Sequence, residues 1–201
     1  MEFGGQDITA YIRKLLSDQQ VSIDFFDAKF IKEKLSFIRL DKDADDNVHM
    51  FELPDGTEIQ VSNKLLGDAS ELLFTNPKST PRGLSAQVYD SLKMCDEVVM
   101  PDLSNNIIIS GGMSMTAGLG DRLDADINAK FASDEKSNVS FKNARVIPSL
   151  ACKERGYTVQ RKYGAWVGGS ILSSLELYHK LKITRQEWEE CGENCLFLKY
   201  L

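Results

Sequence analysis

The glycine-rich turn at residues 110–118 has the clearest capacity to bind a ligand. It follows a short apolar segment, 106–109, and precedes a helical pattern over 119–132. Glycine lets the backbone approach a bound group closely, and the N–H groups at a helix N-terminus attract a polar or anionic ligand. Lys32 and Glu33 form a charged pair earlier in the chain. Taken alone, such a turn is also an ordinary connection and such a pair an ordinary solvated helix face, so both interpretations stay open at this point.

Residues 161–175 combine several signals in a short segment. A basic pair, Arg161-Lys162, precedes the aromatic and apolar run 163–167, which is followed by two glycines and Ser170. This pattern predicts a strand over 163–167, a tight turn at the glycines, and an apolar helix that Ser170 opens by capping its first N–H groups.

The cysteines and histidines could bind a metal only if the fold brought them together. They are Cys95, Cys152, Cys191, Cys195, His49 and His179. The i, i+4 pair at 191 and 195 is half of a metal site at most, and no second pair lies near it in sequence. The alternative, which we favour, is free thiols in a reducing compartment. Because no local Ser/His/Asp or Cys/His pattern is present either, we expect no metal site and no catalytic residue.

Composition and charge narrow the class of protein. The chain has 201 residues, of which 42% are hydrophobic, and a net charge of −6 at pH 7. These values are typical of a globular protein with one domain or two small ones, and the negative charge disfavours direct, sequence-independent binding to nucleic acid. No segment approaches the roughly 20 apolar residues of a membrane span. Residues 1–5 have the pattern of neither a signal nor a transit peptide. We expect a cytoplasmic or nuclear protein without a membrane partner.

Hydrophobic periodicity predicts the elements that position these residues. Helical spacing occurs over 7–16, over 27–37 with Phe30, Ile31 and Leu35 inward, and over 85–94. A β-hairpin is expected at 50–61 because Pro54 and Gly56 supply its turn. Short strands are expected at 106–109 and 144–148, and polar loops at 41–46 and 132–139.

The last helix has a well-marked start. Thr184 and Glu187 have the spacing of a capping box, and Ile183 and Trp188 that of a hydrophobic staple. The polar segment 75–83, which contains two prolines, is the best candidate for a boundary within the chain.

Several segments, in collinear order, resemble actins and actin-related proteins. Residues 161–175 resemble a segment near the family's C-terminus. The other matching segments are 3–16, 31–35, 51–56, 91–96, 109–112 and 170–190. The resemblance implies an α/β fold of the actin-like, RNase H-like nucleotide-binding kind. It implies a partial fold: the second lobe, without its N-terminal strands, plus the C-terminal helices of the first lobe. We expect an outer subdomain at 1–83, an inner subdomain at 84–162, and the C-terminal helices at 163–201.

The resemblance also implies a nucleotide site between the two subdomains of that lobe. Its residues would be Gly5, Lys32, Glu33, Gly112, Met115, Thr116 and Lys162. Lys32 and Glu33 match a charged pair that lines the adenosine pocket, and Gly112 and Met115 match a turn that packs on base and ribose. The family's phosphate-binding loops and its water-positioning glutamine lie upstream of the region that this sequence resembles. We therefore expect ATP or ADP with Mg²⁺ only if the other half is supplied, and no useful ATP hydrolysis by this polypeptide alone.

Three departures from the family pattern bear on function. Thr116 stands where actins carry an aromatic residue against the adenine. The polar stretch 76–83 replaces an apolar loop that helps actins to form filaments, so ordinary filament formation is not expected. Residues 149–159 form an insertion without an actin counterpart, and 157–163 faintly resemble actin-related proteins of chromatin-remodelling complexes.

Apolar residues near the C-terminus suggest a partner surface. In the family, the residues that match Ile171, Leu172, Leu175 and Leu181 line a groove into which partners insert an amphipathic helix. The alternative for these side chains is ordinary core. The favoured function is an actin-like structural subunit of a larger cytoskeletal, axonemal or chromatin-associated assembly. The alternative function is the C-terminal portion of a full-length ATP-binding actin-related protein.

Overall fold

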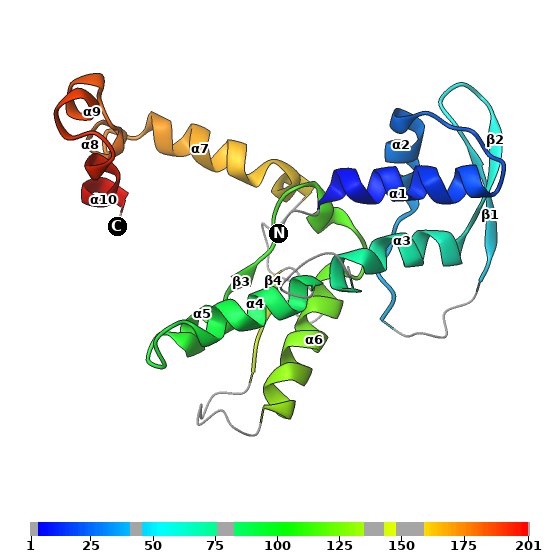
Figure 1. Cartoon of the computed structure of the whole chain (residues 1–201), viewed down its shortest axis with the longest axis horizontal. Coiled ribbons are helices and arrows are strands. Elements are labelled where there is room, and N and C mark those ends of the chain that lie inside the picture. Colours follow the sequence, from blue (N-terminus) through cyan, green and yellow to red (C-terminus); the bar gives the residue numbers. More distant parts are fainter. Residues whose placement is uncertain (1–3, 41–45, 76–82, 135–142, 148–158, 201) are drawn as a thin grey trace. The chain divides into compact units, whose positions relative to one another are not determined.

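The computed structural model describes residues 4–40, 46–75, 83–134, 143–147 and 159–200 (Figure 1). The chain divides into two units, Met1–Lys162 and Tyr163–Leu201, and each is described by itself. Most of the predicted boundary at 75–83 and of the predicted insertion at 149–159 lies outside the described residues. The division into subdomains at residue 83 therefore stays a prediction.

Helix α1, Gly5–Asp18, begins the first unit and confirms the helix predicted over 7–16. The Gly4 N–H donates a 2.8 Å hydrogen bond to the Asp7 carboxylate, which closes the first turn. Ile8, Ile12 and Leu16 follow one another at i, i+4 spacing and are fully buried. The apolar stripe that predicted the helix is thus the face that it packs inward.

Helix α2, Phe25–Leu35, confirms the second predicted helix to within two residues at each end. Its N-cap is Asp24, whose carboxylate accepts a 2.7 Å hydrogen bond from the Asp27 N–H. Ile31 is fully buried as predicted, whereas Phe30 and Leu35 are only half-buried. Phe30 instead packs against the ring of Phe51, with 5.6 Å between ring centroids.

Strands β1, Val48–Glu52, and β2, Glu58–Ser62, form the predicted antiparallel hairpin. Gly56 has φ of +86° at the turn, a conformation that glycine adopts without strain. Ile59 and Val61 alternate with exposed neighbours and point into the core. The hairpin leads directly into α3, Asn63–Thr75, which the sequence analysis did not predict.

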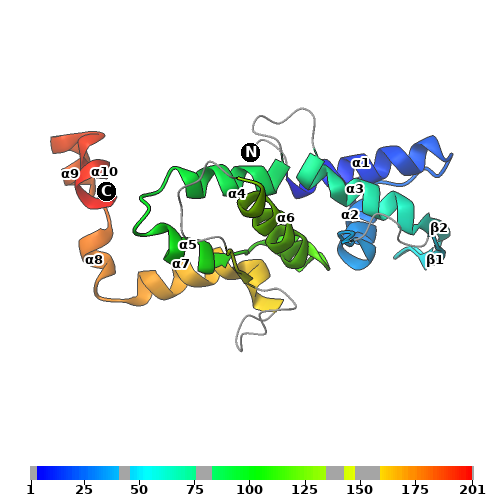
Figure 2. The ribbon, with the colours of Figure 1, turned by 90° about the horizontal axis from the view of Figure 1, so that it is seen from below.

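These elements enclose the first of two apolar clusters in the unit. Helices α1 and α3 run side by side in Figures 1 and 2. The buried members of the cluster are Ile8, Ile12, Leu16, Ile23, Ala28, Ile31, Ile38, Leu53, Ile59, Val61, Leu65, Leu66, Ala69, Leu73 and Leu119. Apolar burial of this extent is the main contribution to the stability of such a fold.

The second cluster lies among the later elements of the unit. These are α4 (Gly83–Lys93), α5 (Met100–Asn105), β3 (Ile107–Ile108), α6 (Leu119–Ser133) and β4 (Val146–Ile147). The buried side chains are Leu92, Met100, Leu123, Ile127, Phe131, Ala144 and Val146. Helices α4 and α6 confirm the predictions at 85–94 and 119–132, whereas α5 was missed. Of the strands predicted at 106–109 and 144–148, the described residues form two-residue strands that pair in parallel, and residue 148 lies outside the described part of the chain.

Two connections join the clusters. Arg122 on α6 donates hydrogen bonds to both carboxylate oxygens of Glu71 on α3, at 2.8 and 3.1 Å, and to the Arg39 carbonyl at 2.9 Å. At the start of α6, Gly118 has φ of +80°, and a Cβ there would stand 2.6 Å from the Ile38 carbonyl oxygen. The close approach of the segment at residue 38 to α6 therefore requires glycine.

The second unit consists of α7 (Gly164–Ser174), α8 (Tyr178–Leu181), α9 (Arg185–Cys191) and α10 (Asn194–Tyr200). The strand predicted over 163–167 and the turn at Gly168-Gly169 are wrong. Tyr163 ends the 3₁₀ helix η2, Val159–Tyr163, and residues 164–169 lie in the continuous helix α7. The described residues offer this segment no partner strand. A helix satisfies its backbone groups internally, which an unpaired strand cannot do. Ser170 lies inside that helix rather than at its start.

The capping box at Thr184 is confirmed, but the helix that it starts, α9, is not the last one, since α10 follows after Gly192. The Thr184 N–H donates to the Glu187 carboxylate at 2.7 Å, and the Glu187 N–H donates to the Thr184 hydroxyl at 3.2 Å. Helices and strands together give the mixed content expected of the predicted fold class. Across the part of the chain that the structure describes, no helix is both long and apolar enough to cross a bilayer.

Candidate ligand pocket

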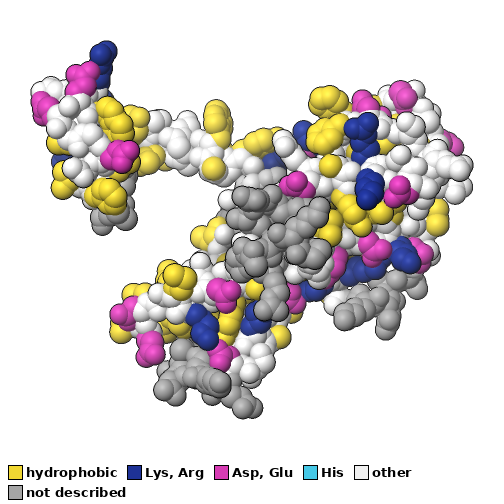
Figure 3. Space-filling model, viewed as in Figure 1, with side chains coloured by type: hydrophobic (Ala, Val, Ile, Leu, Met, Phe, Trp, Pro, Cys, Tyr) yellow, Lys and Arg dark blue, Asp and Glu magenta, His cyan; other side chains and the backbone are white. Residues whose placement is uncertain are grey.

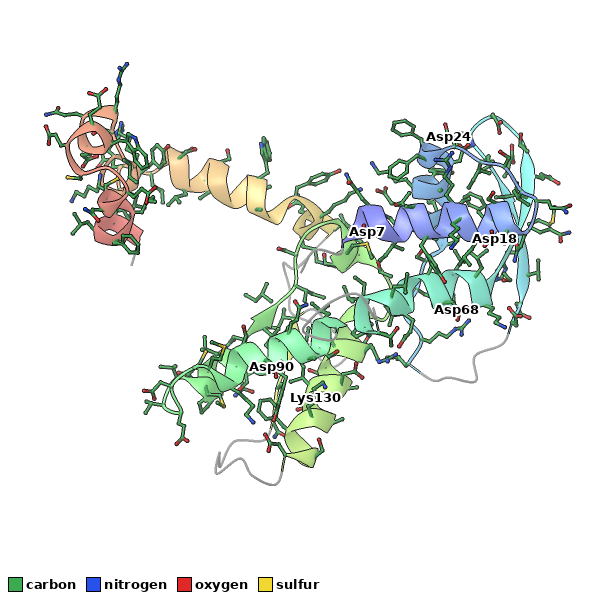
Figure 4. The ribbon with its side chains drawn as sticks, viewed as in Figure 1. Asp7, Asp18, Asp24, Asp68, Asp90 and Lys130 are labelled. Atoms are coloured by element: carbon green, nitrogen blue, oxygen red, sulfur yellow. The ribbon has the colours of Figure 1, made fainter. Side chains whose placement is uncertain are left out.

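A pocket of about 490 Å³ opens in the first unit. Three segments form most of its wall: the N-terminal half of α1, one face of α2, and the short 3₁₀ helix η1, Gly112–Met115. The side chains labelled Asp7 and Asp24 in Figure 4 mark the first turn of α1 and the N-cap of α2. The lining residues are Gly5, Gln6, Thr9, Phe25, Lys29, Lys32, Glu33, Ser36, Gly112, Met113, Met115, Thr116 and Lys162.

The structure brings together every residue that the sequence analysis placed in a nucleotide site. Gly5, Lys32, Glu33, Gly112, Met115, Thr116 and Lys162 all line this pocket. They come from four segments spread over more than three quarters of the chain. That they hold a nucleotide stays a prediction, since the geometry by itself describes a cavity and its chemistry.

Lys32 is the most constrained cation of the pocket. Its Nζ donates hydrogen bonds to the Gly5 carbonyl at 2.6 Å and to the Thr9 hydroxyl at 2.8 Å. The Thr9 hydroxyl in turn donates to the Gly5 carbonyl at 2.9 Å. Burial lowers the pKa of Lys32, and the positive charges of Lys29 and Lys162 lower it further, while Glu33 opposes them. The two hydrogen bonds from Nζ hold this ammonium group at the start of α1.

Gly5 is packed too tightly to carry a larger side chain without movement. A Cβ at this position would lie 3.2 Å from the Cγ and Sδ of Met113 and 3.3 Å from the Lys32 Nζ. The glycine allows the first turn of α1 to approach η1 closely. The pocket floor is thus partly backbone, which leaves its peptide groups near any ligand that enters.

The glycine-rich turn is rigidified by its own hydrogen bonds. The Ser114 hydroxyl donates to the Gly111 carbonyl at 2.7 Å, and the Gly111 N–H donates to the Arg161 carbonyl at 3.0 Å. Arg161 also donates from its Nη2 to the Ser114 carbonyl at 3.2 Å. These contacts attach the segment before Lys162 to the turn and so position Lys162 at the pocket.

Lys162 forms an ion pair with Glu33, with 3.3 Å between Nζ and Oε2. Both side chains remain partly exposed, at 35% and 42%, so the pair stabilises the fold only weakly. The ion pair instead fixes a position, because it links α2 to the end of the first unit at the pocket wall.

Sequence reasoning missed six lining residues. They are Gln6, Thr9, Phe25, Lys29, Ser36 and Met113. A signal for some of them was present: Phe25, Lys29, Lys32 and Ser36 recur at spacings of four, three and four residues. Such residues share one side of a helix. Once Lys32 is placed in the site, this helical spacing predicts that Phe25, Lys29 and Ser36 lie near it.

The pocket combines cationic and apolar groups. Its described lining includes three lysines and one glutamate, together with a phenyl ring and two methionines. Ammonium groups can bind an anionic ligand, and the apolar side chains can contact an apolar or aromatic part of the same ligand. Among the described residues, no three of the His, Cys, Asp and Glu side chains cluster as a metal site would require.

The residues predicted to form a partner groove lie in the second unit. Ile171 and Leu172 are on α7, Leu175 ends that helix, and Leu181 ends α8. The first three are 59%, 41% and 50% exposed, whereas Leu181 is half-buried. These three side chains are thus not covered by their own unit. That they form a groove for a helix stays a prediction.

The cysteines of the described regions are free thiols. Cys95 is half-buried, Cys191 is exposed and Cys195 is buried, with its Sγ donating to the Gly192 carbonyl at 2.8 Å. Cys152 lies outside the described residues. A disulfide therefore makes no contribution to the packing of the described elements.

Known proteins resemble this chain along nearly its whole length. The sequence model of the actin family matches residues 28–200. Actin-like protein 7A of Macaca fascicularis and that of Homo sapiens are each 30% identical to it over 212 residues. The alignments cover 98% of this chain and 44% of each relative, so the chain spans less than half the length of these curated relatives. On this evidence, the chain belongs to the actin family.

Proposed function

We propose that the chain is an actin-like structural subunit of a larger protein assembly, and that its pocket binds the nucleoside part of ATP or ADP. One observation carries the nucleotide proposal: the seven residues matched to a nucleotide site line a single pocket. Four segments distant in sequence had to converge for this to happen. An adventitious surface hollow does not require that convergence.

The lining supports binding of a nucleotide rather than of an apolar ligand. Lys29, Lys32 and Lys162 make it net positive, because only Glu33 opposes them among its described residues. Charge-assisted hydrogen bonds from an anchored ammonium group are strong and directional. Met113 and Met115 supply adaptable apolar surface beside them. We infer that the polar edge of the ligand meets the lysines.

The first experiment identifies what the native protein carries. The assembly is purified through this chain, denatured, and the released nucleotide is identified by chromatography. Release of ATP or ADP, in an amount equal to that of the chain, is the expected result. Assemblies that carry no nucleotide and take up none when ATP is added would leave only the structural proposal.

A variant pair tests the role of the pocket lysine. Lys32→Met should weaken ATP binding at least about tenfold, as expected when a charged hydrogen bond is lost. Lys34→Met is the matched control, since Lys34 lies on the same helix but is exposed and not part of the lining. ATP binding should also weaken as the pH rises, because Lys32 then loses its positive charge. Since the pKa of Lys32 is lowered, this loss should begin at a lower pH than it would for an ordinary lysine. Equal binding by both variants would contradict the proposed site.

We propose further that this polypeptide does not hydrolyse ATP by itself. Phosphoryl transfer depends on positioning the phosphates, Mg²⁺ and the attacking water. The resemblance assigns those groups to a region upstream of the part of the family that this chain matches. A steady-state phosphate-release assay on the isolated chain should therefore give no turnover above background.

The alternative is that the chain is the C-terminal portion of a full-length ATP-binding actin-related protein. The coverage of 44% of each relative favours it. The intact mass of the native protein distinguishes the two. A mass near 22.5 kDa supports a separate subunit, whereas roughly twice that mass supports the longer protein.

The proposed assembly is cytoskeletal, axonemal or chromatin-associated, in the cytoplasm or the nucleus. We propose that a partner contributes an amphipathic helix that contacts the exposed apolar residues of α7. Ile171→Asp, at a side chain that is 59% exposed, should release such a partner without unfolding the chain. Co-purification of the assembly with the variant and with an Arg185→Glu control measures this.

A further inference from the structure

The pocket contains an aromatic ring that the family resemblance did not indicate. Among the described residues that line it, Phe25 is the only aromatic one. Thr116, at the end of η1, lines the same pocket but has no ring. Within this described lining, a ligand can stack on an aromatic ring only at Phe25.

The position of Phe25 is set by well-defined local structure. It is the first residue of α2, directly after the N-cap Asp24, whose carboxylate accepts the Asp27 N–H. Four and seven residues later on the same helix come Lys29 and Lys32, which also line the pocket. The ring and the two ammonium groups thus lie along one side of a single helix.

The neighbouring ring, Phe26, lies outside the pocket lining. The two rings meet edge to face, with 6.4 Å between centroids and 84° between planes. Phe26 is 75% exposed and is not part of the lining, whereas Phe25 is half-buried. Of these two adjacent phenylalanines, only Phe25 faces the pocket, whereas Phe26 faces solvent.

A phenyl ring beside ammonium groups selects a particular class of ligand. A planar base gains free energy by stacking on the ring, while its phosphates or polar edge meet the positive charges. A sugar phosphate or an inorganic phosphate has no planar group to use the ring. We propose that Phe25 is the base-stacking residue of this pocket, and that the pocket selects anionic ligands with an aromatic base. This inference rests on the proposed nucleotide site and specifies how that site recognises its ligand.

The experiment uses the native assembly, freed of bound nucleotide, and labels this chain with 8-azido-ATP under ultraviolet light. Competition by ATP and by inorganic tripolyphosphate is measured with the probe below half-saturation. Phe25→Leu keeps an apolar side chain but removes the ring, and should raise the ATP concentration needed for half-competition about tenfold. Competition by tripolyphosphate should not change. Phe25→Trp should restore ATP competition to within about threefold, and Phe26→Leu is the matched control with no expected effect.

Each result decides the matter. Loss of ATP competition in Phe25→Leu, with recovery in Phe25→Trp, supports base stacking. An unchanged ATP requirement in Phe25→Leu overturns the inference while the nucleotide site stands. An equal loss for ATP and tripolyphosphate means that the ring only maintains the shape of the pocket, and also overturns it. If wild-type chain is not labelled at all, the proposed nucleotide site fails together with the inference.

Discussion

Helices α1 and α7 are both longer than ten residues, but they use their apolar side chains in opposite ways. On α1, Ile8, Ile12 and Leu16 are fully buried. On α7, Trp166 is 77% and Ile171 59% exposed. The same contrast holds for the two units: the first has two apolar clusters, whereas Cys195 is the only buried residue among those described in the second.

With so little apolar burial, the second unit depends more than the first on hydrogen bonds and ion pairs between its short helices. Glu187 caps α9 through Thr184 and also pairs with Lys199 on α10 at 2.7 Å. The Lys199 ammonium additionally donates to the Lys182 carbonyl at 2.6 Å. Hydrogen bonds of this kind define where helices start and end, but short helices are marginal without apolar burial. Figure 3 shows hydrophobic side chains on the visible surface of this unit, as the proposed partner contact requires.

The largest contrast should appear when one isoleucine is truncated in each unit. Ile12→Ala removes a fully buried side chain from the first cluster and should lower the free energy of unfolding by about 2–5 kcal/mol. Ile171→Ala on α7 should change it by less than about 0.5 kcal/mol. Urea unfolding followed by circular dichroism measures both. An equal loss of unfolding free energy at the two positions would mean that α7 is covered in solution. The two helices would then not differ in burial.

Two arginines extend the contrast to ion pairs. Arg122 is 21% exposed and joins Glu71 to Asp126, whereas Arg185 is 92% exposed and pairs with Glu189. Arg122→Met should cost about 2–3 kcal/mol, because it leaves two carboxylates without their charged donor. Arg185→Met should cost less than about 1 kcal/mol. Chemical unfolding of both variants gives the two values, and similar values would show that burial does not govern these pairs.

Glycine-to-alanine exchanges should have opposite signs in the two units. Gly118→Ala places a Cβ at positive φ and against the Ile38 carbonyl, and should cost at least about 1–2 kcal/mol. Gly168→Ala lies within α7 with open space around it and should stabilise that helix by about 0.5–1 kcal/mol. Amide hydrogen exchange of the whole chain reports each helix separately. Faster exchange in α7 of Gly168→Ala would contradict the helical assignment of residues 164–174.

The smallest expected effect is a pH dependence confined to the second unit. Hydrogen bonding to Lys199 and capping of Thr184 lower the pKa of Glu187 to about 2, from an ordinary value of 4.5. A folded-state pKa below the unfolded one gives stability that is present above about pH 4.5 and is lost as the pH falls toward 2. Carboxyl NMR titration should show this pKa. After correction for the intrinsic exchange rate at each pH, the protection of α9 amides should lose its pH dependence in Glu187→Gln. Glu189→Gln serves as control, and a titration of Glu187 near 4.5 would show that the cap does not form.

Sequence periodicity predicted the elements whose signals are local. The apolar stripe of α1, the Pro54–Gly56 turn of the hairpin and the capping box of α9 each lie within a few residues, and all three are present. Helices α3 and α5 were missed. The aromatic run 163–167 was assigned to a strand, although residues 164–167 belong to α7. Side-chain type alone does not reveal whether a partner strand is available.

The sequence by itself determined which residues could serve the pocket, through their resemblance to the actin family, and where most helices begin. Only the tertiary structure decided that these residues meet. It attaches the Lys32 ammonium to Gly5 and Thr9, brings Lys162 to Glu33 across 129 positions of the chain, and adds Phe25 to the lining. The physical reason is range: caps and turns act between near neighbours, whereas a cavity exists only after burial has packed distant segments together.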